Sequence, residues 1–117
     1  MKGAGEKGRL GEEEALSYFL GKGYRLVQKN FRIKGGEVDL ILEKDELLLF
    51  VEVKLRSGSY PGAGLEAVTV KKQRRIIKAA GEYLLLTNQF ARPLRFDVAE
   101  ITREGVAHVE NAFSGEW

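Results

Sequence analysis

The stretch EVDLILEKDELLLFVEVKL, residues 37–55, decides the fold. Two runs rich in Leu, Ile, Val and Phe flank the polar residues 43–46, a pattern that predicts a β-hairpin. A two-residue turn at positions 45 and 46 makes Asp39 face Glu52 across the two strands. Because side chains alternate between the faces of a strand, Lys54 lies on the same face as Glu52. The hairpin therefore predicts that three charged side chains converge.

Two helices and three further strands are expected around this hairpin. Residues 1–9 are basic and glycine-rich without apolar periodicity, so we expect a mobile tail there. Apolar residues at helical spacing predict one helix from Gly11 to Leu20 and another that starts at Thr69 or a nearby residue and runs to about Thr87. The remaining predicted strands are residues 24–34, with a bend near Asn30, and residues 94–102 and 106–110. The chain of 117 residues is thus expected to be a single domain of the α/β class, a central mixed sheet flanked by helices in the order αβββαββ.

The composition excludes several kinds of site and location. With no cysteine and a single histidine, His108, the chain offers no ordinary zinc site, so a metal would have to be a hard cation held by carboxylates. The longest apolar run, residues 47–51, is too short to cross a bilayer, and the basic start lacks the apolar core of a signal peptide. A cytoplasmic protein without a membrane partner is expected.

Charge is divided unevenly along the chain, although the net charge is only +2. Residues 37–53 carry six acidic residues and one basic residue, whereas residues 54–81 carry seven basic residues and one acidic residue. An acidic block beside a basic one suits a divalent-metal site within a surface that binds a polyanion. Ordinary variation of surface charge is the alternative.

Asp39, Glu52 and Lys54 interrupt strands that are otherwise apolar on both faces. An unpaired buried charge costs several kcal/mol, so these acids need a cation. Carboxylates on adjacent rigid strands suit Mg²⁺ or Mn²⁺, and a nearby lysine can orient or deprotonate an attacking water or neutralise charge on phosphorus. A structural ion pair between Lys54 and either acid is the alternative.

These residues resemble the PD-(D/E)XK nuclease superfamily, in a D…EXK form without the proline. Further motifs resemble the YraN family of small bacterial proteins, which is similar to archaeal Holliday-junction resolvases. The motifs are GRLGE (8–12), KGY (22–24), GEVDLI (36–41), FVEVKLR (50–56), VTVKKQ (68–73) and RFDV (95–98). The resemblance implies a restriction-endonuclease-like fold and a nuclease that leaves 5′-phosphate and 3′-hydroxyl ends on DNA.

The resemblance also implies a role for each matching residue of the hairpin. Asp39 and Glu52 match the metal-binding acids, and the main-chain carbonyl of Val53 is expected to add a ligand. Lys54 matches the catalytic lysine. Glu12 matches a first-helix glutamate that lies near the metal, often through water.

On the second helix, Gln73 or Lys72 matches a polar position that the superfamily often uses beside its active site. Gln73 is preferred because it lies in line with the apolar stripe, and a glutamine bonded to backbone at the edge of the core is the alternative. Glu13 and Glu14 are alternatives to Glu12 as the first-helix glutamate. Directions on a helix differ by about 100° per residue, so we expect these two acids to be solvated.

Basic residues on the second helix and in the loop before it are predicted to contact phosphates of nucleic acid. They are Arg56, Lys71, Lys72, Arg74, Arg75 and Lys78. A solvated helix face is the alternative for the helical members. Arg95 and Asp97 are expected to form a structural pair, and His108 to be an ordinary strand residue.

The sequence thus predicts a Mg²⁺- or Mn²⁺-dependent endonuclease that acts on DNA, and the resemblance implies branched or junction DNA as its substrate. A non-catalytic nucleic-acid-binding or scaffold module that retains the fold is the first alternative. A structural domain with an internal ion-pair network is the second. A homodimer is expected, with Phe113 and Trp117 as candidate contacts.

Overall fold

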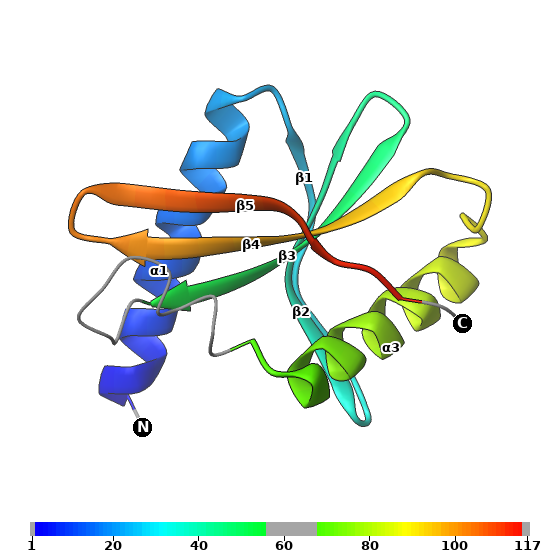
Figure 1. Ribbon diagram of the computed structural model, residues 1–117, viewed down its shortest axis with the longest axis horizontal. Helices are drawn as coiled ribbons and strands as arrows, with labels where there is room; N and C mark the ends of the chain where they lie inside the picture. The colour runs from blue at the N-terminus through cyan, green and yellow to red at the C-terminus, as the bar shows by residue number, and fades with distance from the viewer. Residues whose placement is uncertain (1, 56–67, 116–117) are drawn as a thin grey trace.

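A five-stranded sheet with two helices forms the described part of the protein in a computed structural model (Figure 1). The structure describes residues 2–55 and 68–115, so Arg56 lies outside the described residues. The predicted order αβββαββ and the α/β class are confirmed. The elements are α1 (Lys2–Gly21), β1 (Arg25–Ile33), β2 (Gly36–Lys44), β3 (Leu47–Leu55), α3 (Val70–Thr87), β4 (Leu94–Thr102) and β5 (Gly105–Phe113).

The sheet is mixed, and its strands follow the chain in the order β1-β2-β3-β4-β5. β3 and β4 are parallel because α3 connects them, whereas the other neighbours are antiparallel. Leu40 pairs with Val51 and Leu42 with Leu49, which is the register predicted from a turn at positions 45 and 46. From Leu40 to Val51 the central hairpin is therefore built as the sequence predicts, whereas the predicted pair of Asp39 with Glu52 is not part of the register.

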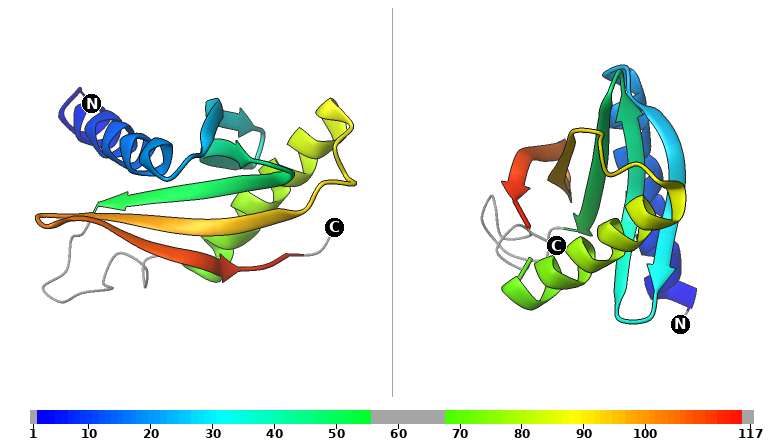
Figure 2. Two further views of the ribbon diagram at one scale, coloured as in Figure 1. Left: turned by 90° about the horizontal axis from the view of Figure 1, so that it is seen from above. Right: turned by 90° about the vertical axis from the view of Figure 1, so that its right-hand side faces the viewer.

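The two helices cover opposite faces of the sheet (Figure 2). On one face, Ala15 and Phe19 of α1 pack with buried residues of the central strands, among them Leu49 and Val51. On the other face, residues of α3 such as Ile76 pack against side chains that include Phe50. Both faces of β3 are buried in this way, which explains its nearly continuous apolar sequence.

The first helix is longer than predicted, since α1 begins at Lys2 rather than at Gly11. Residues 2–9, expected as an irregular tail, are helical instead. Glycine costs about 1 kcal/mol in a helix interior, so the glycines at positions 3, 5 and 8 weaken a helix without ending it. Among the described residues, no helix has the length and the apolar character needed to cross a membrane.

The second helix begins as predicted. The hydroxyl Oγ1 of Thr69 accepts a hydrogen bond from the backbone N–H of Lys72 at 3.1 Å, which makes Thr69 the N-cap. Asn88, with a left-handed φ of 54°, ends the helix. The cap fixes the first turn of α3, and with it the backbone position of Lys72.

Candidate functional site

The candidate site lies where β2 leaves β3. Regular pairing of the two strands ends at Leu40 and Val51, one residue short of Asp39 and Glu52. In Figure 1, the first half of β2 turns away from β3 toward α3. Beyond the last pair, the N–H of Val53 donates a hydrogen bond to Oδ2 of Asp39 at 2.8 Å. The carboxylate thus satisfies a backbone donor at the point where the two strands separate.

The neighbouring strand β1 is irregular at the same level. Asn30 stands opposite Asp39 in the register and has a left-handed φ of 52°. Its side chain donates a hydrogen bond from Nδ2 to Oε1 of Glu12 at 3.0 Å. Val38 packs with α3 and Leu40 with α1. Residues two positions apart share a face in a regular strand, so the regular alternation of side chains along β2 is broken at Asp39. The bend predicted near Asn30 therefore belongs to a local rearrangement around Asp39.

The carboxylates of Asp39 and Glu52 form an acid pair, in which Asp39 is half-buried and Glu52 is buried. Glu52 is only 2% exposed, and its Oε1 has no hydrogen-bond partner in the described part of the chain. Burial, followed by the negative charge of Glu52, raises the pKa of Asp39 to about 7, against the opposing effect of the Val53 N–H. The predicted proximity of the two acids is therefore present, and it disfavours two negative charges in the absence of a cation.

The cation that reaches the acid pair comes from α3. Nζ of Lys72 lies 3.4 Å from Oε2 of Glu52 and 3.8 Å from Oε1 of Glu37. Gln73, in contrast, donates a hydrogen bond from Nε2 to the carbonyl oxygen of Val68 at 3.1 Å. The structure thus brings Lys72 rather than Gln73 to the acids. Gln73 makes a hydrogen bond to the backbone at the edge of the core, which is the alternative stated for it above.

Lys54 follows Glu52 by two residues on β3 and is partly buried. No ion pair within 4.0 Å joins it to Asp39 or Glu52 among the residues that the structure describes. The strand register places it beside Glu100 of β4, an acid that is 2% exposed and that belongs to none of the sequence motifs. The structural ion pair of Glu52 is therefore made by Lys72.

Glu12 lies beside the acid pair without joining it. Burial and, to a smaller extent, the charge of Asp39 raise the pKa of Glu12, while its hydrogen bond from Asn30 opposes the rise. Glu13 and Glu14 are exposed, as predicted. Within residues 2–55 and 68–115, no three acidic, histidine or cysteine side chains come close enough together to hold a metal ion. The acids that could serve as ligands are therefore a pair, Asp39 with Glu52.

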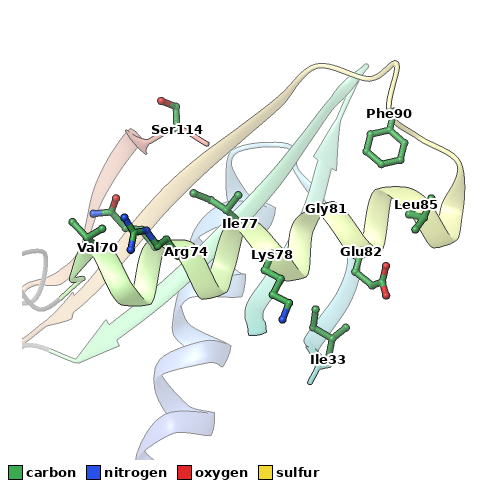
Figure 3. A pocket seen from close by; sticks show the side chains of 11 residues that line it. Ile33, Val70, Arg74, Ile77, Lys78, Gly81, Glu82, Leu85, Phe90 and Ser114 are labelled. Atoms are coloured by element: carbon green, nitrogen blue, oxygen red, sulfur yellow. The ribbon is translucent and has the colours of Figure 1, made fainter. Parts of the chain in front are cut away.

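The basic residues of α3 do not all face the acid pair. Arg74 and Lys78 line a groove of about 690 Å³ (Figure 3). Arg74 follows Lys72 by two residues, which turns it by about 200° to the other side of the helix. Lys71 and Arg75 are exposed on the flank between the groove and Lys72. The apolar residues that line the groove are Ile33, Val70, Ile77, Leu85 and Phe90.

A second polar cluster lies on the α1 side of the sheet, around Asp97. Its buried carboxylate accepts hydrogen bonds from Nε and Nη2 of Arg95 at 2.8 and 2.9 Å, so the predicted pair is confirmed. His108 is more than an ordinary strand residue: its Nε2 lies 2.6 Å from Oδ2 of Asp97, and its Nδ1 lies 3.1 Å from the hydroxyl of Tyr18. These residues join α1 to β4 and β5, and no local motif could reveal them because Tyr18 and His108 are 90 positions apart.

Comparisons with known proteins give one consistent match. The model of "Uncharacterised protein family UPF0102" matches residues 11–101, a range that includes Glu12, Asp39, Glu52 and Lys54. A UPF0102 protein of Clostridioides difficile (strain 630) is 41% identical over 110 residues, covering 92% of this chain and 96% of the relative. A UPF0102 protein of Sulfurihydrogenibium sp. (strain YO3AOP1) is 40% identical over 111 residues, covering 95% of this chain and 96% of the relative. A third, of Syntrophomonas wolfei, is 42% identical over 112 residues, covering 92% of this chain and 97% of the relative.

Proposed function

The chain belongs to the UPF0102 family, which is the YraN family that its motifs resemble, and we propose that it is a divalent-metal-dependent endonuclease acting on DNA. The acid pair carries this proposal. Asp39 and Glu52 lie together at the fork of β2 and β3, and a buried oxygen of Glu52 has no hydrogen-bond partner in the described chain. Structural acids in such a position are normally satisfied, so the unsatisfied oxygen favours a ligand.

The donor set fits Mg²⁺ or Mn²⁺. Mg²⁺ is usually bound by one or two carboxylates, with waters and phosphate oxygens as the other ligands, so a pair of acids is enough. Asp39 and Glu52 would hold the ion, the main-chain carbonyl of Val53 is proposed as a further ligand, and Glu12 as a contact through water. A divalent cation would also relieve the repulsion that raises the pKa of Asp39. When bound, the metal supplies positive charge to the scissile phosphate and acidifies a water.

Two lysines complete the proposed mechanism. Lys54 is partly exposed on the strand that carries Glu52, so its ammonium group can orient the attacking water or neutralise charge on the phosphate. Lys72 holds Glu52 in place through their 3.4 Å contact. In the hydrolysis, the water oxygen forms a bond to phosphorus, the bond from phosphorus to the 3′ oxygen breaks, and that oxygen takes up a proton. The products carry a 5′-phosphate and a 3′-hydroxyl.

The partners and location follow from this chemistry. The exposed Lys71 and Arg75, beside Lys72, are proposed to contact the DNA backbone, and junction or other branched DNA is the proposed substrate. A homodimer would supply two sites for two strands. Phe113 is a poor contact for it, because its ring stacks on that of Phe96 at 5.1 Å within one core, and Trp117 lies outside the described residues. We place the protein in the cytoplasm, together with DNA.

A cleavage assay tests the proposal. Branched, single-stranded and linear duplex DNA are each incubated with the protein and Mg²⁺ or Mn²⁺. Glu52→Gln and Lys54→Met should lower the rate by about 100-fold or more, since each removes a group proposed to act on the charged reacting centre. Glu46→Gln, in the exposed turn between β2 and β3, is the matched control and should cut like the wild type.

Two results would count against the enzyme. If the wild type cuts no substrate while it and both variants bind DNA equally, the protein is a non-catalytic binding module. If the wild type cuts and Glu52→Gln cuts equally well, the acid pair is not the active site.

A further inference from the structure

We infer that the edge strand β1 forms a second side of the DNA-binding surface through Lys29 and Arg32, opposite the basic flank of α3. The inference deepens the proposed function and rests on its DNA-binding part, not on cleavage. Neither residue is among the nucleic-acid contacts predicted from the sequence, which lie on α3 and in the preceding loop. The acid pair would then lie between two groups of cations.

Arg32 is connected to the acid pair through one shared carboxylate. Nε of Arg32 lies 3.3 Å from Oε2 of Glu37, and Nζ of Lys72 lies 3.8 Å from Oε1 of the same carboxylate. Lys72 in turn contacts Glu52 at 3.4 Å. Alternating charges thus run from β1 across the start of β2 to α3. The Arg32 side chain is 70% exposed, so its guanidinium remains accessible to a phosphate.

Lys29 is also exposed, and it pairs with Leu40, which packs on the α1 face of the sheet. Lys29 and Arg32 flank Asn30, the residue that binds Glu12 and stands opposite Asp39. The charges of both basic residues act on Glu12 and oppose the rise of its pKa. The two cations therefore lie on the part of β1 that is next to Glu12 and opposite Asp39.

DNA that crosses the acid pair needs cations close to its path. Its phosphates are repelled by Asp39 and Glu52, and each basic residue that neutralises a phosphate also releases counterions. Cations on α3 alone would contact the DNA backbone from one side only. β1 is the edge of the sheet, so within residues 2–55 and 68–115 no further strand covers the side on which Lys29 and Arg32 are exposed.

Edge strands also carry basic residues for another reason, because charge prevents pairing with other chains. Arg25 separates the two explanations. It lies on the same strand, its side chain is 76% exposed, and it forms an ion pair with Glu43 at 2.8 Å, much as Arg32 does with Glu37. It stands at the other end of β1, away from Asn30. Protection of the edge would treat Arg25 and Arg32 alike, whereas DNA binding at the acid pair would not.

The experiment measures DNA affinity as a function of salt concentration. Fluorescence anisotropy of labelled duplex and single-stranded DNA is recorded in EDTA, so that no cleavage occurs, for the wild type, Lys29→Gln, Arg32→Gln and the control Arg25→Gln. Loss of one phosphate contact should reduce the slope of log K against log [salt] by about 0.9 for duplex DNA or about 0.7 for a single strand. We expect this reduction for Lys29→Gln and Arg32→Gln, and an unchanged slope for Arg25→Gln.

The outcomes separate this inference from the nuclease proposal. An equal reduction in Arg25→Gln would show that only net charge matters, and unchanged slopes in both test variants would remove β1 from the surface; either result overturns the inference. A wild type that binds neither duplex nor single-stranded DNA also overturns the inference. A wild type that binds with the expected slopes but cuts nothing with Mg²⁺ or Mn²⁺ supports the inference and overturns the nuclease instead.

Discussion

Replacing Asp39 with asparagine should flatten the pH dependence of stability in the metal-free protein. The pKa of Asp39 is raised from 3.8 to about 7 in the folded state. Between these values the folded protein holds a proton that the unfolded chain has released, so the free energy of unfolding of the wild type falls as pH rises. Asparagine keeps the shape of the protonated acid and can still accept the hydrogen bond from Val53, but it has no proton to lose.

The size of the effect follows from the pKa values. Between about pH 4 and about pH 7, each unit of pKa difference corresponds to 1.36 kcal/mol, so the wild type should lose at most about 4 kcal/mol relative to Asp39→Asn. Burial of Asp39 and the charge of Glu52 are the main causes of this loss. Most of the loss is therefore the cost of placing two acids in one buried position.

Urea denaturation in EDTA at a series of pH values from about 4.5 to about 8 measures the effect. Glu46→Gln, which removes an acid from an exposed turn, serves as the control for a change of net charge. Wild-type and Asp39→Asn curves that stay parallel over this range would refute the reasoning, and so would a wild type whose stability rises relative to the variant. Mg²⁺ at about pH 8 should restore stability to the wild type and the control but not to Asp39→Asn, by about 2.7 kcal/mol at 100 times its Kd.

Three further substitutions, one of them with a matched control, test contacts at the site and elsewhere in the fold. Lys72→Met should lower metal-free stability by about 2 kcal/mol, since it leaves the carboxylate of Glu52 without its cation, and chemical denaturation that finds no loss would contradict the ion pair. Asp97→Asn should cost about 3–5 kcal/mol in urea by leaving a guanidinium without its anion, while DNA cleavage by the folded variant should persist because the cluster lies on the α1 side. Gly36→Ala would place a Cβ 2.5 Å from a carbonyl oxygen of α3 and should cost about 1–3 kcal/mol. Thermal melting should show no such loss for Gly21→Ala, whose Cβ meets nothing within 4 Å.

The register of the hairpin was predictable because it depends on local information. Two apolar runs and one short turn leave a single pairing that buries both runs, and that pairing brings Asp39 and Glu52 one residue beyond its last pair. The cap at Thr69 was predictable for the same reason, since a capping side chain acts within its own helical turn.

Features that depend on contacts between distant elements were not predictable in this way. Helical periodicity gives the direction of a side chain but not how far it reaches, so it favoured Gln73, whereas the longer Lys72 contacts Glu52 across the core edge. The bond between Tyr18 and His108 joins α1 to β5, and neither residue is part of a motif. The start of α1 was missed because single glycines lower helix propensity without setting a boundary.

The fork between β2 and β3 makes one backbone amide a reporter of the site. The N–H of Val53 donates to the carboxylate of Asp39 instead of to a strand carbonyl, so its hydrogen bond changes whenever that carboxylate gains a proton or binds a cation. The ¹⁵N–¹H resonance of Val53 should therefore titrate with Asp39 and shift when a metal is added. Protonation and metal binding at the acid pair can thus be followed at a single peptide group, without substrate and without a label on either acid.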